Sequence, residues 1–251
     1  EDLLGDCIAY VLSHEVGHTL SLMHNMAGSS SIPVESLRDP KFTQEYGTTY
    51  SIMDYARNNY IAQPGDKEKG VRMTPPELGA YDYYAISWLY KPIFEAKTSE
   101  EEIPILDKWI SEKSGDPKYR YGKQQFKRRF DPSSVEEDLG DDPVKASEYG
   151  RRNLQYILKH INEWVADKDK DFEFRTALYD EVVYGYVRYL SFVLADIGGI
   201  YLNERYDGDQ RPSYQTVSKE QQKKALNFLL NELKDLSWLD ANETLKEFAS
   251  R

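Results

Sequence analysis

Three histidines lie close together near the start of the chain, in the segment HEVGHTLSLMH at residues 14–24. His14 and His18 are four residues apart, so a helix places both imidazoles on one face, where they can bind one metal ion. Glu15 would stand beside that ion, where a general base must lie to take a proton from water. His24 can reach the same ion only if the helix ends after Leu20 and the chain turns back. The spacing therefore predicts a metal site with a carboxylate beside it.

This segment resembles the elongated HExxHxxGxxH motif of metzincin zinc endopeptidases. The resemblance implies one catalytic Zn²⁺ ion as cofactor, with His14, His18 and His24 as its ligands and Glu15 as the general base. Ser21 stands where that motif has its turn glycine. A left-handed backbone costs a non-glycine residue about 1 kcal/mol, so the turn is expected to be either strained or differently shaped.

A second motif, SIMDY at residues 51–55, resembles the Met-turn of the same clan in the SxMxY form of astacins and serralysins. The resemblance implies that Met53 lies beneath the metal. It also implies that Tyr55 is either a switchable zinc ligand or a phenolic donor to the oxyanion. By residue type alone, Met53 could equally be a core gap-filler and Tyr55 an ordinary half-buried aromatic.

The whole chain resembles the C-terminal part of large bacterial Met-zincin proteins of the cell envelope. Its specific motifs cover residues 14–55, and from residue 93 onward the likeness is general and assigns no site. The resemblance implies a protein or peptide substrate and a periplasmic or secreted location.

Composition excludes several other classes of protein. The 251 residues carry 32 Lys plus Arg against 43 Asp plus Glu, a net charge of −11 that disfavours nucleic acid as a partner. The single cysteine, Cys7, excludes an internal disulfide. No apolar run approaches the length of a membrane span, and the first residues lack the features of a signal peptide. Oligomeric state is left open.

Hydrophobic periodicity predicts a mainly α fold (α+β overall). The resemblance implies that this fold is a metzincin lower subdomain followed by a helical region. Residues 25–50 and 93–141 read as long connections, the second on the surface with one short helix at 103–111. We expect a zinc-binding catalytic subdomain at 1–92 and a mainly helical C-terminal region at 93–251 packed on it. The other expected helices span about 2–20, 74–90, 143–165, 173–197 and 219–233, with two extended pieces around an Asp-Gly turn within 200–217.

Metzincins place a twisted sheet before the active-site helix, and this chain begins almost on that helix. We therefore expect the N-terminal sheet subdomain to belong to a longer protein, and this chain to be weakly active or inactive alone.

Two other functions fit the same residues. A gluzincin-type metallopeptidase would use a glutamate from a second helix, for which Glu35, Glu45 or Glu77 could be proposed. A catalytically inactive, metal-bound binding or structural module (a pseudo-protease) would keep the ligands without turnover. The fourth histidine, His160, has apolar helix neighbours and is not expected to be a ligand.

Overall fold

The computed structural model describes residues 2–74, 78–127, 129–165, 167, 169–205 and 210–240. Its helices are α1 (Asp2–Thr19), α2 (Ala27–Ser30), α3 (Pro40–Tyr46), α4 (Ala80–Tyr90), α5 (Ser99–Lys113), α6 (Pro143–Val165), α7 (Glu173–Leu194) and α8 (Lys219–Glu232). Short 3₁₀ helices lie at η1 (Val34–Arg38), η2 (Lys67–Lys69), η3 (Pro117–Tyr119) and η4 (Ser237–Asp240). The strands are β1 (Ile200–Leu202) and β2 (Tyr214–Thr216).

The predicted mainly α fold is confirmed. Within the described ranges the only sheet is the antiparallel β1–β2 pair, in which Ile200 lies opposite Thr216. This confirms the two extended pieces, while the expected Asp207–Gly208 turn lies outside the described residues. Among the helices that the structure describes, none is long and apolar enough to cross a membrane. The division at residues 92 and 93 stays a prediction.

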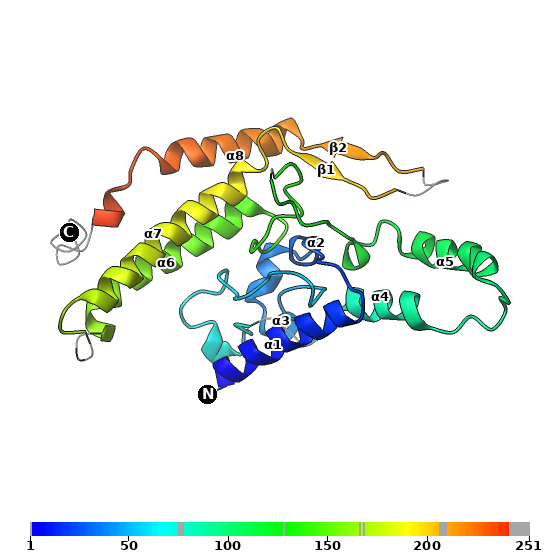
Figure 1. The fold of residues 1–251 in the computed structure, drawn as a ribbon. Coiled ribbons are helices and arrows are strands. Elements are labelled where there is room, and N and C mark those ends of the chain that lie inside the picture. Colours follow the sequence, from blue (N-terminus) through cyan, green and yellow to red (C-terminus); the bar gives the residue numbers. More distant parts are fainter. Residues whose placement is uncertain are drawn as a thin grey trace.

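The C-terminal helices form an elongated layer in which α6 and α7 run antiparallel and α8 lies along them (Figure 1). α6 begins as predicted at Pro143, and the carboxylate of Asp142 accepts a hydrogen bond from Lys145 N at 3.2 Å. Its apolar stripe packs on α7 and η4. The buried residues at this contact are Leu154, Leu158 and Ile161 of α6 and Val182 and Tyr186 of α7. α7 ends at Leu194, three residues before its predicted end at 197, and the turn that follows it reaches Gly198, which has φ = 72°.

Residues 25–50 were expected to be irregular, and this prediction is wrong in part. The segment contains α2, η1 and α3, and it supplies the main core cluster with Ile32 and Leu37, both fully buried. These elements are too short to show a periodic apolar pattern, because one or two turns carry only one or two inward positions.

The surface assignment of residues 93–141 also needs correction. α5 is longer than predicted, with the side chain of Thr98 capping its first turn at Glu101 N. Val135 and Leu139 are each 1% exposed, so the end of the segment runs through the core. These isolated apolar residues stand among charged neighbours, so they form no periodic apolar pattern that would predict their burial.

α1 matches its predicted extent, but its apolar stripe does not face the described core. The stripe residues are 41–66% exposed: Leu3, Leu4, Ile8, Val11, Leu12 and Leu20. Tyr10 and His14 of the same helix are buried. α4 begins at Ala80 rather than at 74 or 75, and residues 75–77 lie outside the described part of the chain.

Candidate metal centre

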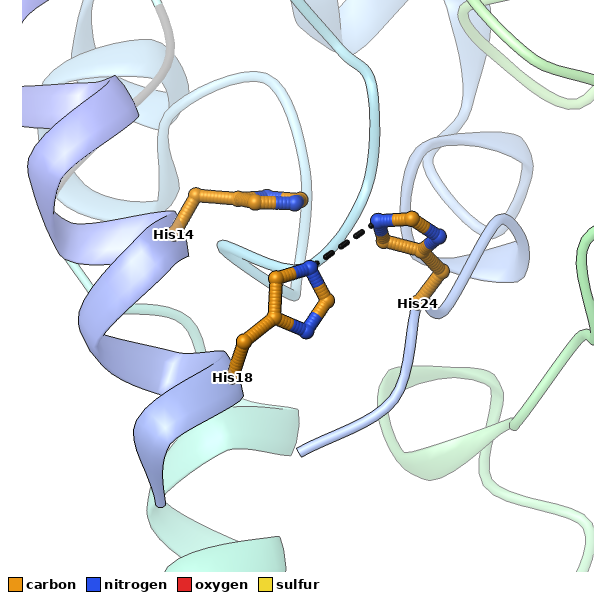
Figure 2. A group of neighbouring side chains, drawn as sticks. All are labelled: His14, His18 and His24. Carbon is orange, nitrogen blue, oxygen red and sulfur yellow. Dashed lines mark hydrogen bonds between the residues drawn. The ribbon is translucent and has the colours of Figure 1, made fainter. Parts of the chain in front are cut away.

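His14 and His18 project from one face of α1, and His24 projects toward them from the segment that follows the helix (Figure 2). Each histidine offers one ring nitrogen, and these three atoms lie within 4.8 Å of one another. The Nε2 atoms of His18 and His24 are 3.1 Å apart. Two nitrogens that ligate one tetrahedral zinc at about 2.0–2.1 Å would be about 3.3 Å apart, so the observed approach suits a shared ion.

The chain turns back between the second and third histidines through a left-handed residue, Ser21, with φ = 65°. Leu22 N donates to Gly17 O and Ser21 N donates to His18 O, both at 3.0 Å. This pair of bonds closes the Schellman motif that ends many helices. Of the two turn shapes expected from the sequence, the structure has the strained one, in which serine adopts a conformation that favours glycine.

The Nδ1 atom of every ring in the cluster faces a hydrogen-bond acceptor. Since a carbonyl oxygen can only accept, each Nδ1 carries the hydrogen, and each Nε2 is left with a lone pair. Three converging lone pairs repel one another unless a cation lies between them, so the residues fit a metal ion. The contacts are His14 Nδ1 to Ile52 O at 2.8 Å, His18 Nδ1 to Leu22 O at 3.0 Å and His24 Nδ1 to Gln124 Oε1 at 2.5 Å.

Burial favours the neutral form of the His14 imidazole. His14 is 5% exposed, and burial is the main cause that lowers its pKa below the usual value. Positive charge on His18 or His24 would lower this pKa further, while the hydrogen bond to Ile52 and the charge of Glu15 oppose the shift. The neutral imidazole is the form that binds metals.

Met53 lies directly against the turn of α1 that carries the ligands. It is fully buried in a cluster with Tyr10, Leu22 and Ile52. A Cβ atom placed on Gly17 would lie 2.4 Å from the Met53 sulfur, so the helix backbone and the thioether are in contact. The glycine inside HEVGH is therefore required by packing.

Comparison with models of protein families matches one family, Met-zincin, over residues 1–251. The chain belongs to the Met-zincin family. Comparisons with curated proteins and with solved structures gave no match. Family membership and the histidine cluster together indicate a zinc-metallopeptidase-type domain.

Two further predicted residues of this Met-zincin lie beside the cluster. The Tyr55 hydroxyl is 3.1 Å from His24 Nε2, and burial raises the pKa of Tyr55, with the charges of Glu136 and Glu15 acting in the same direction. Glu15 is exposed, and its charge also acts on His14. The Tyr55 hydroxyl is therefore in hydrogen-bonding contact with the cluster, and Glu15 follows His14 directly on α1.

Residues 51 and 52 of the predicted Met-turn are anchored by a carboxylate that no sequence motif indicated. Asp82, in the first turn of α4, is 1% exposed. It accepts from Ser51 Oγ at 2.8 Å and from Ile52 N and Gly79 N at 2.7 Å each. An aspartate at the third position of a helix is a recognisable capping feature, but its link to residues 51 and 52 is visible only in the fold.

Gln124 and Glu136 are two more residues near the cluster that were not predicted, because the family resemblance assigns no site from residue 93 onward. Gln124 holds His24 Nδ1, and its amide donates to the carboxylate of Glu136 at 2.5 Å. Neither residue belongs to a motif with metal-ligand spacing, so the sequence contains no feature that could have found them.

Of the rival gluzincin ligands, Glu35 and Glu45 do not join the cluster. Among the described residues, the His14, His18 and His24 group is the one that could hold a metal. Glu35 accepts from Tyr149 Oη at 2.9 Å and pairs with Lys145, while Glu45 is exposed. Glu77 lies outside the described residues. His160 stacks on Trp164 in α6.

Proposed function

We propose that this Met-zincin is a zinc-dependent metalloendopeptidase whose substrate is a protein or peptide. The observation that carries the proposal is the convergence of three Nε2 atoms whose rings are all oriented by acceptors at Nδ1. Orientation of a ligating histidine through its second nitrogen is what metal sites in proteins use. His14, His18 and His24 would hold the ion.

The chemistry would be divided between the metal and two side chains. Zinc bound at this site would supply Lewis acidity, which polarises a carbonyl group and lowers the pKa of water. Glu15 would accept the proton of the attacking water and deliver it to the leaving amine. The Tyr55 hydroxyl would donate a hydrogen bond to the oxyanion that develops on the substrate carbonyl.

A groove next to the segment that leads into His24 could take a side chain of a peptide substrate, although none of the three histidines lines it. It has a volume of about 660 Å³ and starts at Ser21, Leu22 and Met23, immediately before His24. The rest of its wall includes aromatic side chains of α4 and of the segment after α5: Tyr81, Tyr84, Trp88, Tyr119 and Tyr121. Apolar walls with few polar groups are typical of sites that take side chains of a ligand.

The exposed apolar stripe of α1 supports the expectation that another part of the natural protein covers this helix. Contiguous exposed apolar surface marks a face that a partner or a further segment buries. A sheet placed there would complete the cleft. The family resemblance also favours action in the bacterial cell envelope, in the periplasm or after secretion.

The test is the substitution Glu15→Gln, which keeps the size of the side chain and removes the base. We expect turnover of a peptide library to fall by about 10²–10⁴-fold while zinc content stays unchanged. His14→Ala should lose zinc as measured by elemental analysis. The exposed Glu95→Gln is the matched control. Wild-type turnover by Glu15→Gln, in this chain or in a longer protein that contains it, would contradict the assigned base.

A second candidate is a metal-bound module without turnover. It is favoured by the exposed apolar stripe of α1. Zinc binding with no peptidase activity, in the full-length protein as well as in this chain, would select this alternative.

A further inference from the structure

The third histidine of the cluster is held differently from the other two. His14 and His18 donate to the backbone carbonyls of Ile52 and Leu22. His24 instead faces a side chain, the amide oxygen of Gln124, at 2.5 Å. The orientation of this ring therefore depends on a residue 100 positions away, which can be replaced without altering the backbone.

The amide of Gln124 is itself fixed by a carboxylate. Its Nε2 donates to Glu136 Oε1 at 2.5 Å, which leaves its oxygen turned toward His24. The hydrogen bonds run in one direction, from the imidazole N–H to the amide oxygen and from the amide N–H to the carboxylate. This polarity keeps the proton on Nδ1 and the lone pair on Nε2 of His24.

The backbone that carries these two residues is well anchored. Gly122 N donates to Asn25 Oδ1 at 2.8 Å, and Met26 N donates to Gly122 O at 2.8 Å, so the chain beside Gln124 is joined to the residues that follow His24. Val135, next to Glu136, is 1% exposed. Both side chains therefore approach His24 from segments that the fold holds in place.

We propose that Gln124 and Glu136 form a positioning relay that sets the tautomer and orientation of His24 and thereby the affinity of the cluster for its metal. The relay rests on the proposed function, because it acts through a metal ligand. It makes the segment between α5 and α6 part of the metal centre. Loss of such outer contacts costs about 10–100-fold in metal affinity in other metal sites.

The first experiment measures zinc affinity by competition with a chromophoric chelator. Gln124→Met keeps the length of the side chain but removes the acceptor, and we expect zinc affinity about 10–100-fold below that of the wild type. Glu136→Gln should weaken binding in the same direction. The matched controls are Gln215→Ala and Glu181→Gln, both at exposed positions, and neither should change affinity.

The second experiment uses a combined variant that exchanges the two groups. Gln124→Glu together with Glu136→Gln puts a carboxylate next to His24 and an amide behind it. The carboxylate at position 124 still accepts from His24 Nδ1, and the amide at position 136 donates to that carboxylate. We expect zinc affinity close to that of the wild type, and clearly above that of Gln124→Met. A general loss of packing would not be repaired by this exchange.

A spectroscopic readout separates positioning from structure. In ¹⁵N-resolved NMR of the zinc-loaded protein, Gln124→Met should shift the Nδ1–H resonance of His24 and leave those of His14 and His18 in place. Wild-type affinity in Gln124→Met, or equal shifts of all three rings, would overturn the relay while the metal site stands. Failure of the wild-type protein to bind zinc would overturn both the relay and the proposed function.

Discussion

Individual residues at this centre occupy conformations that a different side chain would find costly or impossible. Ser21 lies in the left-handed region with φ = 65°, and Gly17 leaves space for the sulfur of Met53. The strained backbone of Ser21 lets the chain reverse, so that His24 lies beside α1. The absence of a side chain at Gly17 avoids a clash with Met53. Both effects can be measured by single substitutions.

Ser21→Gly should stabilise the protein. The left-handed conformation costs an L-residue about 1–2 kcal/mol, whereas the extra freedom of glycine in the unfolded chain costs about 0.4–1 kcal/mol. We expect a net gain of about 0.5–1 kcal/mol in the free energy of unfolding, measured by urea denaturation. Ser21→Ala keeps a Cβ atom and should not gain; an equal gain from alanine would argue against backbone strain.

Gly17→Ala should destabilise the protein by about 1–3 kcal/mol, because the new methyl group would overlap Met53 Sδ at 2.4 Å. Gly5 provides a control on the same helix, since a Cβ there would meet nothing within 4 Å. Gly5→Ala should instead gain up to about 1 kcal/mol from helix propensity. Thermal unfolding of both variants checks the contrast, and a matching gain in Gly17→Ala would disprove the close packing.

At the scale of elements, the long helices were predictable and the short ones were not. α6 could be located from its Asp-Pro start and its apolar stripe, and α8 from Ser218, whose hydroxyl accepts from Gln221 N at 3.1 Å. α2 and α3 escaped prediction because helices of one or two turns depend on tertiary contacts for their stability. The loop that follows residues 51–55 is likewise held by contacts between elements.

Asp66 organises that loop. It is 3% exposed, lies 2.7 Å from Arg38 Nε of η1, and accepts from Gln63 N at 2.9 Å. The hydrogen bond from Arg38 is the main cause that lowers the pKa of Asp66 from 3.8 to about 2. The depressed pKa means that this stabilisation is complete above about pH 4 and is lost as the pH falls through about 2.

We therefore expect Asp66→Asn to lose about 2 kcal/mol of unfolding free energy at pH 6, and the difference from the wild type to shrink as the pH falls from 4 toward 2. Urea denaturation over this pH range provides the measurement, with the exposed Asp180→Asn as the control. A difference that stays constant with pH would show that charge on Asp66 does not contribute.

At the scale of the whole molecule, the segment between α5 and α6 returns to the histidine cluster and contacts it. Asn25, which is fully buried, connects three segments. Its backbone N–H donates to Met53 O at 3.0 Å, its Nδ2 donates to Arg120 O at 3.0 Å, and its Oδ1 accepts from Gly122 N at 2.8 Å. The residue after His24 therefore joins Met53 to the segment that carries Gln124.

Asn25→Ala should cost about 2–4 kcal/mol, since it leaves the N–H of Gly122 and the carbonyl of Arg120 unpaired. Hydrogen exchange should rise at residues 119–125, which reports the loosened connection. The exposed Asn58→Ala should stay within about 0.5 kcal/mol of the wild type. Unchanged exchange in Asn25→Ala would show that the two segments are held together by other contacts.

The amino-acid sequence alone determined the helix that carries His14 and His18, the need for a reversal before His24, and the likeness of residues 51–55 to a Met-turn. These features are local. Helical geometry relates His14 to His18, four residues apart, and a single turn after the helix brings back His24, ten residues after His14. Only the tertiary structure decided that Gln124 contacts His24 and that Asp82 contacts Ile52, and Glu136 joins the first of these contacts through Gln124. Contacts across 30 to 100 residues depend on the path of the whole chain, and no local periodicity encodes that path.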